Sequence, residues 1–254
     1  MHNRQAVLDY WNDPNVESMY DKYLIDAEIN LIRRRLLPDS KILDAGCGEG
    51  EGSVVYAGIK GASIVAADFS DTRLAKAKER LAGLNNVSFQ KVDFLDPWNL
   101  GGGFDAVVSQ RFLINLMEWP LQQKVLAGLI QALSPSGRLI LLEGHQKGVD
   151  ELNAYRQASE LEPIPVKWHN LFLDEDKLLP FMRELGCDQV DEDGLGAYFL
   201  LTRGVRPQLA TELNWDCDFN RRAASPEVSD VLQLKAKFSR LKLWVFQKAR
   251  APSK

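Results

Sequence analysis

The segment Lys41–Gly52, KILDAGCGEGEG, joins an apolar run to an acidic residue and to glycines at alternating positions. Glycine lets the backbone approach a ligand where a side chain would collide, and it adopts positive φ angles at little cost. A dinucleotide-binding GxGxxG pattern is absent, because counting from Gly46 or from Gly48 puts another residue at the third glycine position. A phosphate-binding P-loop is excluded, since no Gly-Lys-Ser/Thr follows. Two interpretations of this segment remain: a turn that binds a different ligand, and a strand-to-helix turn that is merely tight.

Acidic residues recur at the ends of the next two apolar runs. Asp68 closes SIVAAD and Asp93 closes VSFQKVD. The carboxyl ends of neighbouring parallel strands face one crevice, where open α/β sheets bind ligands. Asp68 follows Gly46 by about 20 residues, the separation expected of an acid that binds ribose hydroxyls. A merely tight turn does not explain these acids, so the sequence predicts a nucleoside site with Asp68 on the ribose and Asp93 on the adenine amine.

Two further acids, Glu49 and Glu51, lie among the glycines at the start of an expected helix. Negative charge there would repel a pyrophosphate but not a cationic sulfonium. The pattern therefore favours S-adenosylmethionine over a dinucleotide as the ligand.

The elements that must position these residues follow from the hydrophobic pattern. Short apolar runs alternate with amphipathic stretches between Lys41 and Leu142, which predicts repeated βα units and a parallel sheet. The fold class expected is α/β, a Rossmann-like doubly wound sheet that is mostly parallel with a late antiparallel strand. The expected strands are Lys41–Ala45, Ser63–Asp68, Val87–Lys91, Phe104–Ser109, Gly137–Leu142, Ala197–Arg203 and Leu241–Lys248, with helices at Gly50–Ile59, Asp71–Ala82 and Pro120–Leu133.

The chain is expected to form one integrated domain with four parts. Residues 1–37 would be a helical N-terminal lid, and residues 38–144 the ligand-binding core. Residues 145–195 would be a cap excursion with a helix, interrupted by the rigid Pro163–Pro165 segment. Residues 196–254 would hold the last two strands and a long insertion between them.

The motifs resemble those of the class I S-adenosylmethionine-dependent methyltransferase family. ILDAGCGEG is similar to its glycine motif, IVAADFS to its ribose motif and VDFLD to its adenine motif. FDAVVSQRFLINL is similar to the fourth-strand motif, and LSPSGRLILLEG to the turn and fifth strand, so the resemblance covers about residues 38–144. It implies that Asp44, Gly46, Gly48 and Gly50 line the methionine side of the cofactor, Asp68 and Phe69 the ribose, Asp93 and Phe94 the adenine, and Gln110 and Arg111 the floor beneath the sulfonium.

Some of these residues have an equally ordinary structural interpretation. Core packing would explain Phe69 and Phe94 as well as adenine contact does. An ion pair or a carboxylate clamp would explain Arg111 better than catalysis does.

Methyl transfer is a displacement at carbon, which requires alignment of the reacting groups and exclusion of water. A hydroxyl acceptor also needs a general base, and histidine is the usual choice near neutral pH. His145 directly follows the fifth strand and is the first candidate; His169, in the cap, is the second, and His2 lies near the N-terminus. Tyr155, on the helical piece of the cap, is a candidate for contacting a polar or anionic substrate. A structural role or a solvated helix face is the alternative for each of them.

Composition limits the partners. The net charge of −4 disfavours nucleic acid, and RFLINL lacks the Asn/Asp-Pro-Pro-Tyr/Phe signature of many base-methylating relatives. The three cysteines form no CxxC pair, so neither a disulfide framework nor a metal site is expected. We find no secretory leader and no apolar run near the roughly 20 residues of a membrane span. A cytoplasmic protein acting on a small-molecule acceptor is predicted, without a prediction of its oligomeric state.

Three functions agree with these patterns. The first is methyl transfer to an oxygen or nitrogen of a metabolite, natural product or sugar. The second keeps the cofactor but cyclises or eliminates its own aminobutyrate chain and releases methylthioadenosine. The third is a non-catalytic module that binds S-adenosylmethionine.

Overall fold

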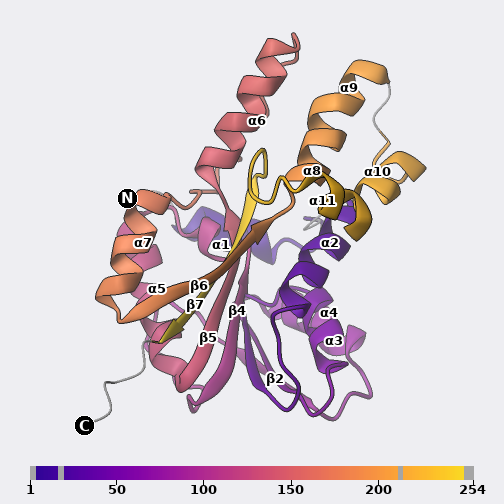
Figure 1. Cartoon of the computed structure of the whole chain (residues 1–254). Helices are drawn as coiled ribbons and strands as arrows, with labels where there is room; N and C mark the ends of the chain where they lie inside the picture. Colours follow the sequence, from indigo (N-terminus) through magenta and orange to yellow (C-terminus); the bar gives the residue numbers. More distant parts are fainter. Residues whose placement is uncertain (1–3, 17–19, 211–213, 249–254) are drawn as a thin grey trace.

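A central sheet organises the chain, which we describe from a computed structural model covering residues 4–16, 20–210 and 214–248 (Figure 1). Its strands are β1 (Lys41–Ala45), β2 (Ser63–Asp68), β3 (Val87–Lys91), β4 (Phe104–Gln110), β5 (Leu133–Gly144), β6 (Cys187–Gly194) and β7 (Leu241–Lys248). Within the described residues they form a seven-stranded sheet in the order β3-β2-β1-β4-β5-β7-β6. Strands β1 to β5 are parallel, and β7 is antiparallel to β5 and β6. The predicted Rossmann-like fold with a late antiparallel strand is confirmed.

One predicted strand is wrong. Ala197–Arg203 is helical, and the strand beside β7 is instead β6. A short apolar run does not distinguish a buried strand from a buried helix by periodicity alone. The helix buries Tyr198 and Phe199, whereas β6, with the sequence CDQVDEDG, is an exposed edge strand that lacks an apolar pattern.

Helices cover both faces of the sheet, as expected for a doubly wound fold. Leu126 of one helix and Met182 of another pack into the core on one face, while Ile32 and Tyr56 lie in the core on the other. The helices are α1 (Arg4–Asn12), α2 (Lys22–Arg33), α3 (Glu51–Ala57), α4 (Asp71–Arg80), α5 (Trp119–Ala132), α6 (Gln146–Ala158), α7 (Glu175–Glu184), α8 (Gly196–Phe199), α9 (Arg206–Leu209), α10 (Asp218–Ala223) and α11 (Pro226–Leu232), with a 3₁₀ turn η1 (Leu113–Asn115) and a π-helical segment η2 (Leu200–Val205).

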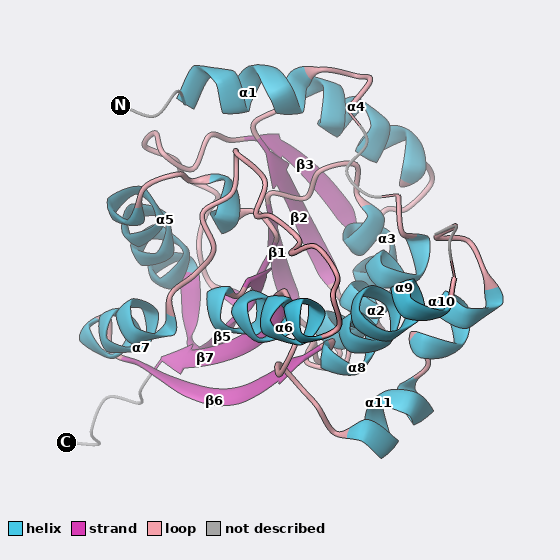
Figure 2. Cartoon of the chain, turned by 90° about the horizontal axis from the view of Figure 1, so that it is seen from above, coloured by secondary structure: helices cyan, strands magenta, loops and turns pink. Residues whose placement is uncertain are grey.

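The register of the parallel strands brings their carboxyl ends to one level. Ala45 of β1 is paired with Ala67 of β2 and with Ser109 of β4, and Asp68 is paired with Lys91 of β3. The loops that follow these strands therefore meet above one end of the sheet. Figure 2, which views the molecule from above, shows α1 beside α4, and Figure 1 shows α6 rising from this end of the sheet.

The N-terminal segment is helical, as predicted, in α1 and α2. Leu24, Ile29 and Ile32 of α2 are buried, in agreement with the apolar stripe in the sequence. Among the described residues, no helix combines the length and the apolar character that crossing a membrane requires.

Candidate functional site

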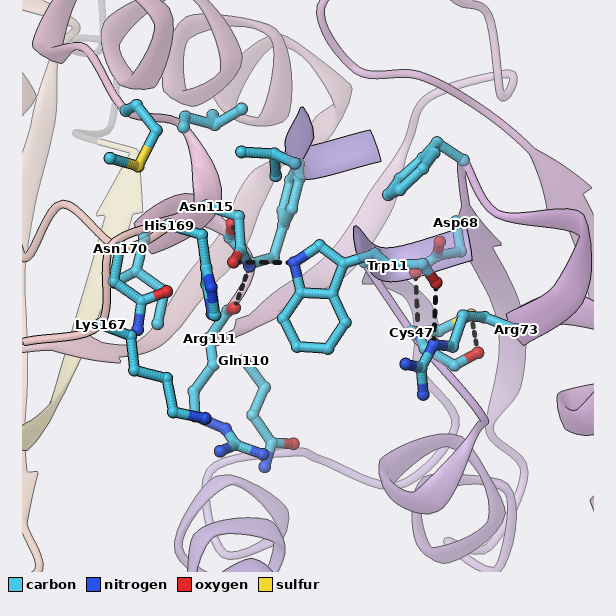
Figure 3. Close-up of a pocket in the computed structure, with 18 of the residues that line it drawn as sticks. Trp11, Cys47, Asp68, Arg73, Gln110, Arg111, Asn115, Lys167, His169 and Asn170 are labelled. Atoms are coloured by element: carbon cyan, nitrogen blue, oxygen red, sulfur yellow. Dashed lines mark hydrogen bonds between the residues drawn. The ribbon is translucent and has the colours of Figure 1, made fainter. Parts of the chain in front are cut away.

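A cavity of about 600 Å³ lies above the carboxyl ends of the central strands (Figure 3). Helices α1 and α2, the glycine loop after β1, and the loop that follows α6 contribute to its wall. Of the predicted site residues it brings together Asp44, Gly46, Gly48, Asp68, Phe69, Asp93, Phe94, Gln110, Arg111 and His169. Gly50, His145 and Tyr155 do not line it.

The glycine loop has the backbone that only glycine adopts readily. The φ angles of Gly46, Gly48 and Gly50 are 73°, 55° and 79°. A Cβ atom on Gly46 would lie 2.6 Å from Phe112, whereas one on Gly48 would meet no atom within 4 Å. A Cβ atom on Gly50 would lie 2.6 Å from Leu81. Gly50 therefore permits close packing against the end of α4, and its contact with the methionine side of the cofactor stays a prediction.

Asp68 fastens the glycine loop to the tip of β2. One carboxylate oxygen accepts a hydrogen bond from the backbone N–H of Gly48 and the other accepts one from that of Ser70, each at 2.9 Å. Burial raises the pKa of Asp68 above its ordinary value, although these two hydrogen bonds act in the opposite direction. Each oxygen of a carboxylate has about two lone-pair sites, so Asp68 can still accept the hydroxyls of a ribose.

Asp44 and Asp93 contact the cavity from the neighbouring strands. Asp44 accepts a hydrogen bond of 2.6 Å from the hydroxyl of Ser53, and burial raises its pKa to about 6. Asp93 accepts a hydrogen bond of 2.9 Å from the backbone N–H of Leu95 and forms an ion pair with Arg4 of α1. The lid helix is thus tied to the acid predicted to contact adenine.

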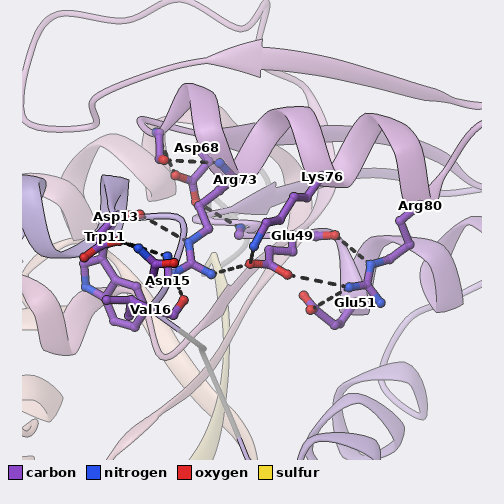
Figure 4. Close-up of polar contacts among 12 residues, drawn as sticks. Trp11, Asp13, Asn15, Val16, Glu49, Glu51, Asp68, Arg73, Lys76 and Arg80 are labelled. Carbon is purple, nitrogen blue, oxygen red and sulfur yellow. Dashed lines mark hydrogen bonds and ion pairs between the residues drawn. The ribbon is translucent and has the colours of Figure 1, made fainter.

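Glu49 and Glu51 do not present free negative charge to the cavity (Figure 4). Glu49 pairs with Arg73 at 2.5 Å and with Lys76 at 2.9 Å, and Glu51 pairs with Arg80 at 3.0 Å. The predicted repulsion of a pyrophosphate by these two acids is therefore largely cancelled by the basic face of α4.

The same network holds the N-terminal segment in place. The guanidinium of Arg73, nearly buried, donates hydrogen bonds to the backbone oxygens of Trp11 at 3.2 Å and Val16 at 2.7 Å (Figure 4). The Arg73 guanidinium also lies 5.2 Å from the centre of the Trp11 ring. The glycine loop, α4 and the lid are consequently one connected unit.

A buried glutamate of the lid fixes the floor of the cavity. Glu28 of α2 accepts a hydrogen bond of 2.8 Å from the Gln110 side chain and pairs with Arg111 at 3.2 Å. Arg111 has a φ of 51°, an uncommon backbone conformation for a residue other than glycine. The ion-pair interpretation of Arg111 is the one that the geometry supports. Sequence reasoning missed Glu28, whose signal is a single acid within the apolar stripe of α2.

Glu143, at the end of β5, was also missed. It is fully buried and accepts hydrogen bonds from the hydroxyl of Ser109 at 2.6 Å and from the backbone N–H groups of Phe112 and Leu113 at 3.0 Å. Burial raises the pKa of Glu143 to about 7. Its carboxyl group organises η1, which carries cavity residues, without lining the cavity itself. An acid inside the apolar run RLILLEG is the signal in the sequence.

His169 lines the cavity from the cap and is 2% exposed. Its ring centre lies 4.5 Å from that of Tyr10, 5.6 Å from that of Trp11 and 5.2 Å from that of Trp168. Burial lowers the pKa of His169, and the charge of Lys167 lowers it further. Its Nδ1 atom is buried with no hydrogen-bond partner in the part of the chain that the structure describes.

His145 has a structural role in place of the predicted catalytic one. Its Nε2 atom lies 3.3 Å from a carboxylate oxygen of Glu175, and its ring meets the ring of Trp244 edge-on with centres 5.7 Å apart. Glu175 also accepts hydrogen bonds from Lys242 at 2.5 Å and from Trp244 at 2.8 Å. The side chain that follows β5 is therefore directed under α7 and away from the cavity. His2 lies outside the described residues.

Tyr155 is also placed away from the cavity. Its ring packs against Gly204 of η2 and against Phe238, whose ring centre is 6.1 Å away. Its hydroxyl accepts a weak hydrogen bond from the side chain of Gln208 at 3.3 Å. The face of α6 that carries Tyr155 packs against η2, so the structure does not support a contact between this residue and a substrate.

A family model described as a methyltransferase domain matches residues 36–184, more than half of the chain. The chain belongs to this methyltransferase domain family.

Individual relatives agree with that assignment. The chain is 38% identical over 103 residues to a demethylmenaquinone methyltransferase of Clavibacter sepedonicus, in an alignment of 41% of this chain and 40% of that protein. It is 28% identical over 195 residues to the N-methyltransferase tcpN of Claviceps purpurea (strain 20.1), in an alignment of 72% of this chain and 66% of that protein. These alignments span less than two thirds of either relative's length.

A solved structure shares the fold over its full length. The N-methyltransferase NodS from Bradyrhizobium japonicum WM9, in complex with S-adenosyl-L-homocysteine, has a TM-score of 0.60 with this chain, and the alignment covers 100% of both chains. The sequence identity is 14%, so this likeness establishes the fold alone.

The cavity has the features that the adenosyl cofactor implied by the motifs would require. The space beside Gly48 is open, and a side chain there would intrude into it. Asp68, Asp93 and Phe69 reach the same cavity from the tips of β2 and β3, where a nucleoside would lie.

Gly48 and Gly83 offer a matched test, because a side chain at either position would meet no atom within 4 Å. We expect Gly48→Ala and Gly83→Ala each to cost about 1–2 kcal/mol of stability, because both residues have positive φ angles and open space beside them. Only Gly48→Ala should weaken S-adenosylhomocysteine binding, by several-fold, since Gly83 lies outside the cavity lining. Thermal unfolding and calorimetric titration measure the two effects.

Gly46→Ala should lower the stability of the fold more than Gly48→Ala or Gly83→Ala does, because its Cβ atom would also collide with Phe112. Equal cofactor affinity in Gly48→Ala and Gly83→Ala would show that the loop does not contact the ligand.

Proposed function

We propose that this methyltransferase transfers the methyl group of S-adenosylmethionine to an oxygen or nitrogen atom of a small molecule. The observation that carries the proposal is a single cavity with two unlike halves. One half has the glycine loop, Asp68 and Asp93, and the other half is closed by the cap and contains His169. The names of the two sequence relatives, both methyltransferases, support the reaction type.

The first half of the cavity would bind the cofactor, which supplies an electrophilic methyl carbon when bound. Asp68 would accept the ribose hydroxyls through the lone pairs left by its two backbone contacts. Asp93 would accept the adenine amine, and the open side of Gly48 would leave room for the methionine portion. Gln110 and Arg111, fixed by Glu28, would form the floor at the tip of β4.

The second half would hold the acceptor. Its apolar wall would include Leu116, Met117, Leu121, Ile164 and Phe172, which line the same cavity and are not assigned to the cofactor. Alignment of two reactants in such an enclosure can supply roughly 7–11 kcal/mol of the barrier reduction. The aromatic side chains of Tyr10 and Trp11, beside His169, would keep water from the reacting atoms.

His169 would act as the general base for a hydroxyl acceptor. Because its pKa is lowered, the ring is neutral and able to accept a proton at neutral pH. Its Nδ1 atom is buried and has no hydrogen-bond partner in the described chain, so a reacting hydroxyl would have to approach it within the closed cavity. The proton lost by the acceptor as it attacks would pass to this ring.

Product analysis separates this function from the other two. The protein is incubated with S-adenosylmethionine and a panel of metabolite-sized alcohols, phenols and amines, and the products are resolved by mass spectrometry. We expect S-adenosylhomocysteine in equal amount to a methylated acceptor. Methylthioadenosine formed without any acceptor would favour cyclisation or elimination of the cofactor, and tight binding without turnover across the panel would favour a non-catalytic module.

Apolar lining from residues not assigned to the cofactor, such as Met117 and Phe172, supports the first outcome, because it is available for contact with an acceptor. A small-molecule acceptor, the disfavoured nucleic-acid partner and a cytoplasmic location remain predictions from the sequence.

A further inference from the structure

Cationic side chains gather on the cap side of the cavity. Arg111 is at the tip of β4, Lys167 in the loop after α6, Arg203 in η2 and Arg240 directly before β7, and all four line the cavity. Arg111 pairs with Glu28 at 3.2 Å, and Arg203 pairs with Asp21 at 2.6 Å. Neither Lys167 nor Arg240 forms an ion pair with a carboxylate of the described residues.

Lys167 and Arg240, which form no ion pair with a described carboxylate, lie close to other positively charged side chains. Arg240 donates a hydrogen bond of 3.2 Å to the backbone oxygen of Pro165, and its guanidinium lies 5.7 Å from the centre of the Phe172 ring. Burial lowers the pKa of Arg240 to about 10, and Arg203 contributes to this. Burial also lowers the pKa of Lys167, with contributions from Arg111 and Arg240. Like charges repel in a partly desolvated cavity, and an anion placed among them would remove the repulsion.

Arg240 lies next to a different part of the sheet from the residues assigned to the cofactor. The residues assigned to adenine, ribose and methionine follow β3, β2 and β1, which are consecutive strands of the sheet. Arg240 precedes β7, which lies beyond β4 and β5 on the other side of β1. An anion bound by Arg240 would therefore belong to the acceptor and not to the cofactor.

The surroundings of the cations indicate what else the acceptor carries. Phe172 and Ile164, from the same loop as Lys167, line the cavity with apolar surface, and Met117 and Leu121 do so from the segment around the start of α5. A ligand that contacts both sets has a charged end and an apolar body.

We propose that the acceptor of this methyltransferase is an amphiphilic anion, a carboxylate on an apolar body, whose carboxylate is bound by Lys167 and Arg240. The inference rests on the proposed methyl transfer, since it names the class of acceptor. Lys167 and Arg240 touch the anionic end, and the apolar wall orients the atom to be methylated toward the tip of β4.

Isosteric probes test the charge requirement. Protein loaded with S-adenosylhomocysteine is titrated with naphthalene-2-carboxylate and with naphthalene-2-carboxamide, and separately with decanoate and decanamide. We expect the carboxylate of at least one pair to bind tenfold or more tightly than its amide. Lys167→Met and Arg240→Met should remove this preference while leaving the affinity for the amide unchanged. Lys60→Met, an exposed lysine remote from the cavity lining, is the matched control and should retain it.

The possible outcomes are distinct. Equal affinity for acid and amide, or no binding of any probe, would overturn the proposed acceptor class. If Lys167→Met weakened S-adenosylhomocysteine binding but not methylthioadenosine binding, the cations would bind the amino-acid carboxylate of the cofactor, and the inference would be wrong. Failure of the unaltered protein to bind S-adenosylhomocysteine would instead refute the proposed function. Lys167 is exposed on one side, so its variant is expected to fold.

Discussion

Replacing Asp68 with alanine is expected to weaken S-adenosylhomocysteine binding by about a hundredfold, and by at least tenfold. The carboxylate would form hydrogen bonds with the ribose hydroxyls, and bonds to a charged group contribute roughly 1.5–3 kcal/mol each. Loss of two such bonds amounts to about 3 kcal/mol, which is on the order of a hundredfold in the dissociation constant. Alanine also releases the N–H of Gly48, so the glycine loop would lose its tie to β2. Calorimetric titration measures the affinity.

Two further variants separate ligand contact from loop support. Asp68→Asn retains one acceptor oxygen and should give a smaller loss of affinity than alanine. Asp188→Ala removes an exposed acid from β6, outside the cavity lining, and should leave the affinity unchanged. An Asp68→Ala protein that is folded, as judged by its thermal unfolding, and binds S-adenosylhomocysteine normally would remove the basis of the cofactor assignment.

The sequence could predict that the proposed cofactor residues come together in one cavity, because local structure fixes the place of each of them. Gly46 and Gly48 directly follow β1, and Asp68 is the last residue of β2. A strand alternates its side chains and a parallel sheet aligns its carboxyl ends, so a residue type at a strand tip has a defined place in space. Gly50, with a φ of 79°, also packs against Leu81 at the end of α4, a contact between distant segments that no local motif predicts.

The acceptor half depends on contacts between segments distant in sequence. Lys167 and Arg240 meet above the sheet because the cap loop folds back over the segment before β7, where Arg240 donates to Pro165. His145 was the favoured base because it follows β5 directly. Its ring instead contacts Glu175 of α7 and does not line the cavity. The sequence identified each histidine as a candidate and contained no information on which of them α7 would cover.

The wrong strand has a related cause. Ala197–Arg203 is apolar enough to be a buried strand, but Tyr198 donates a hydrogen bond of 2.7 Å to the carboxylate of Asp21 at the start of α2. This tertiary contact favours a helical path along the lid. The actual edge strand, β6, gains its stability from pairing with β7 and not from burial of its side chains.

Replacing His169 with asparagine is expected to lower kcat for a hydroxyl acceptor by a factor of about 10²–10⁴, the usual contribution of a general base. The acceptor used is one identified by product analysis. The KM for S-adenosylmethionine should change little, because His169 lies in the cap with Tyr10 and Trp168 and not beside the nucleoside residues. Rates measured with the acceptor saturating and the S-adenosylmethionine concentration varied give both parameters.

The pH dependence distinguishes a base from a structural ring. The pKa of His169 is lowered from its ordinary value of 6.5 by burial and by Lys167, while Tyr10 is the other ionisable group whose ring packs on it. The neutral ring is the active base, so kcat should rise with pH through a midpoint below 6.5 and then remain constant. His169→Asn should lose this rise. A rise caused by Glu143, whose pKa is about 7, would persist in the variant.

The matched comparison is His145→Asn, because both variants remove a buried imidazole and only one of the two rings lines the cavity. Loss of the contact between His145 and Glu175 should lower the thermal unfolding temperature and leave the kcat of the folded protein nearly unchanged. If His169→Asn kept full activity and His145→Asn lost it, the general base would be His145, which does not line the cavity. The proposed division of the cavity into a cofactor half and an acceptor half would then be wrong.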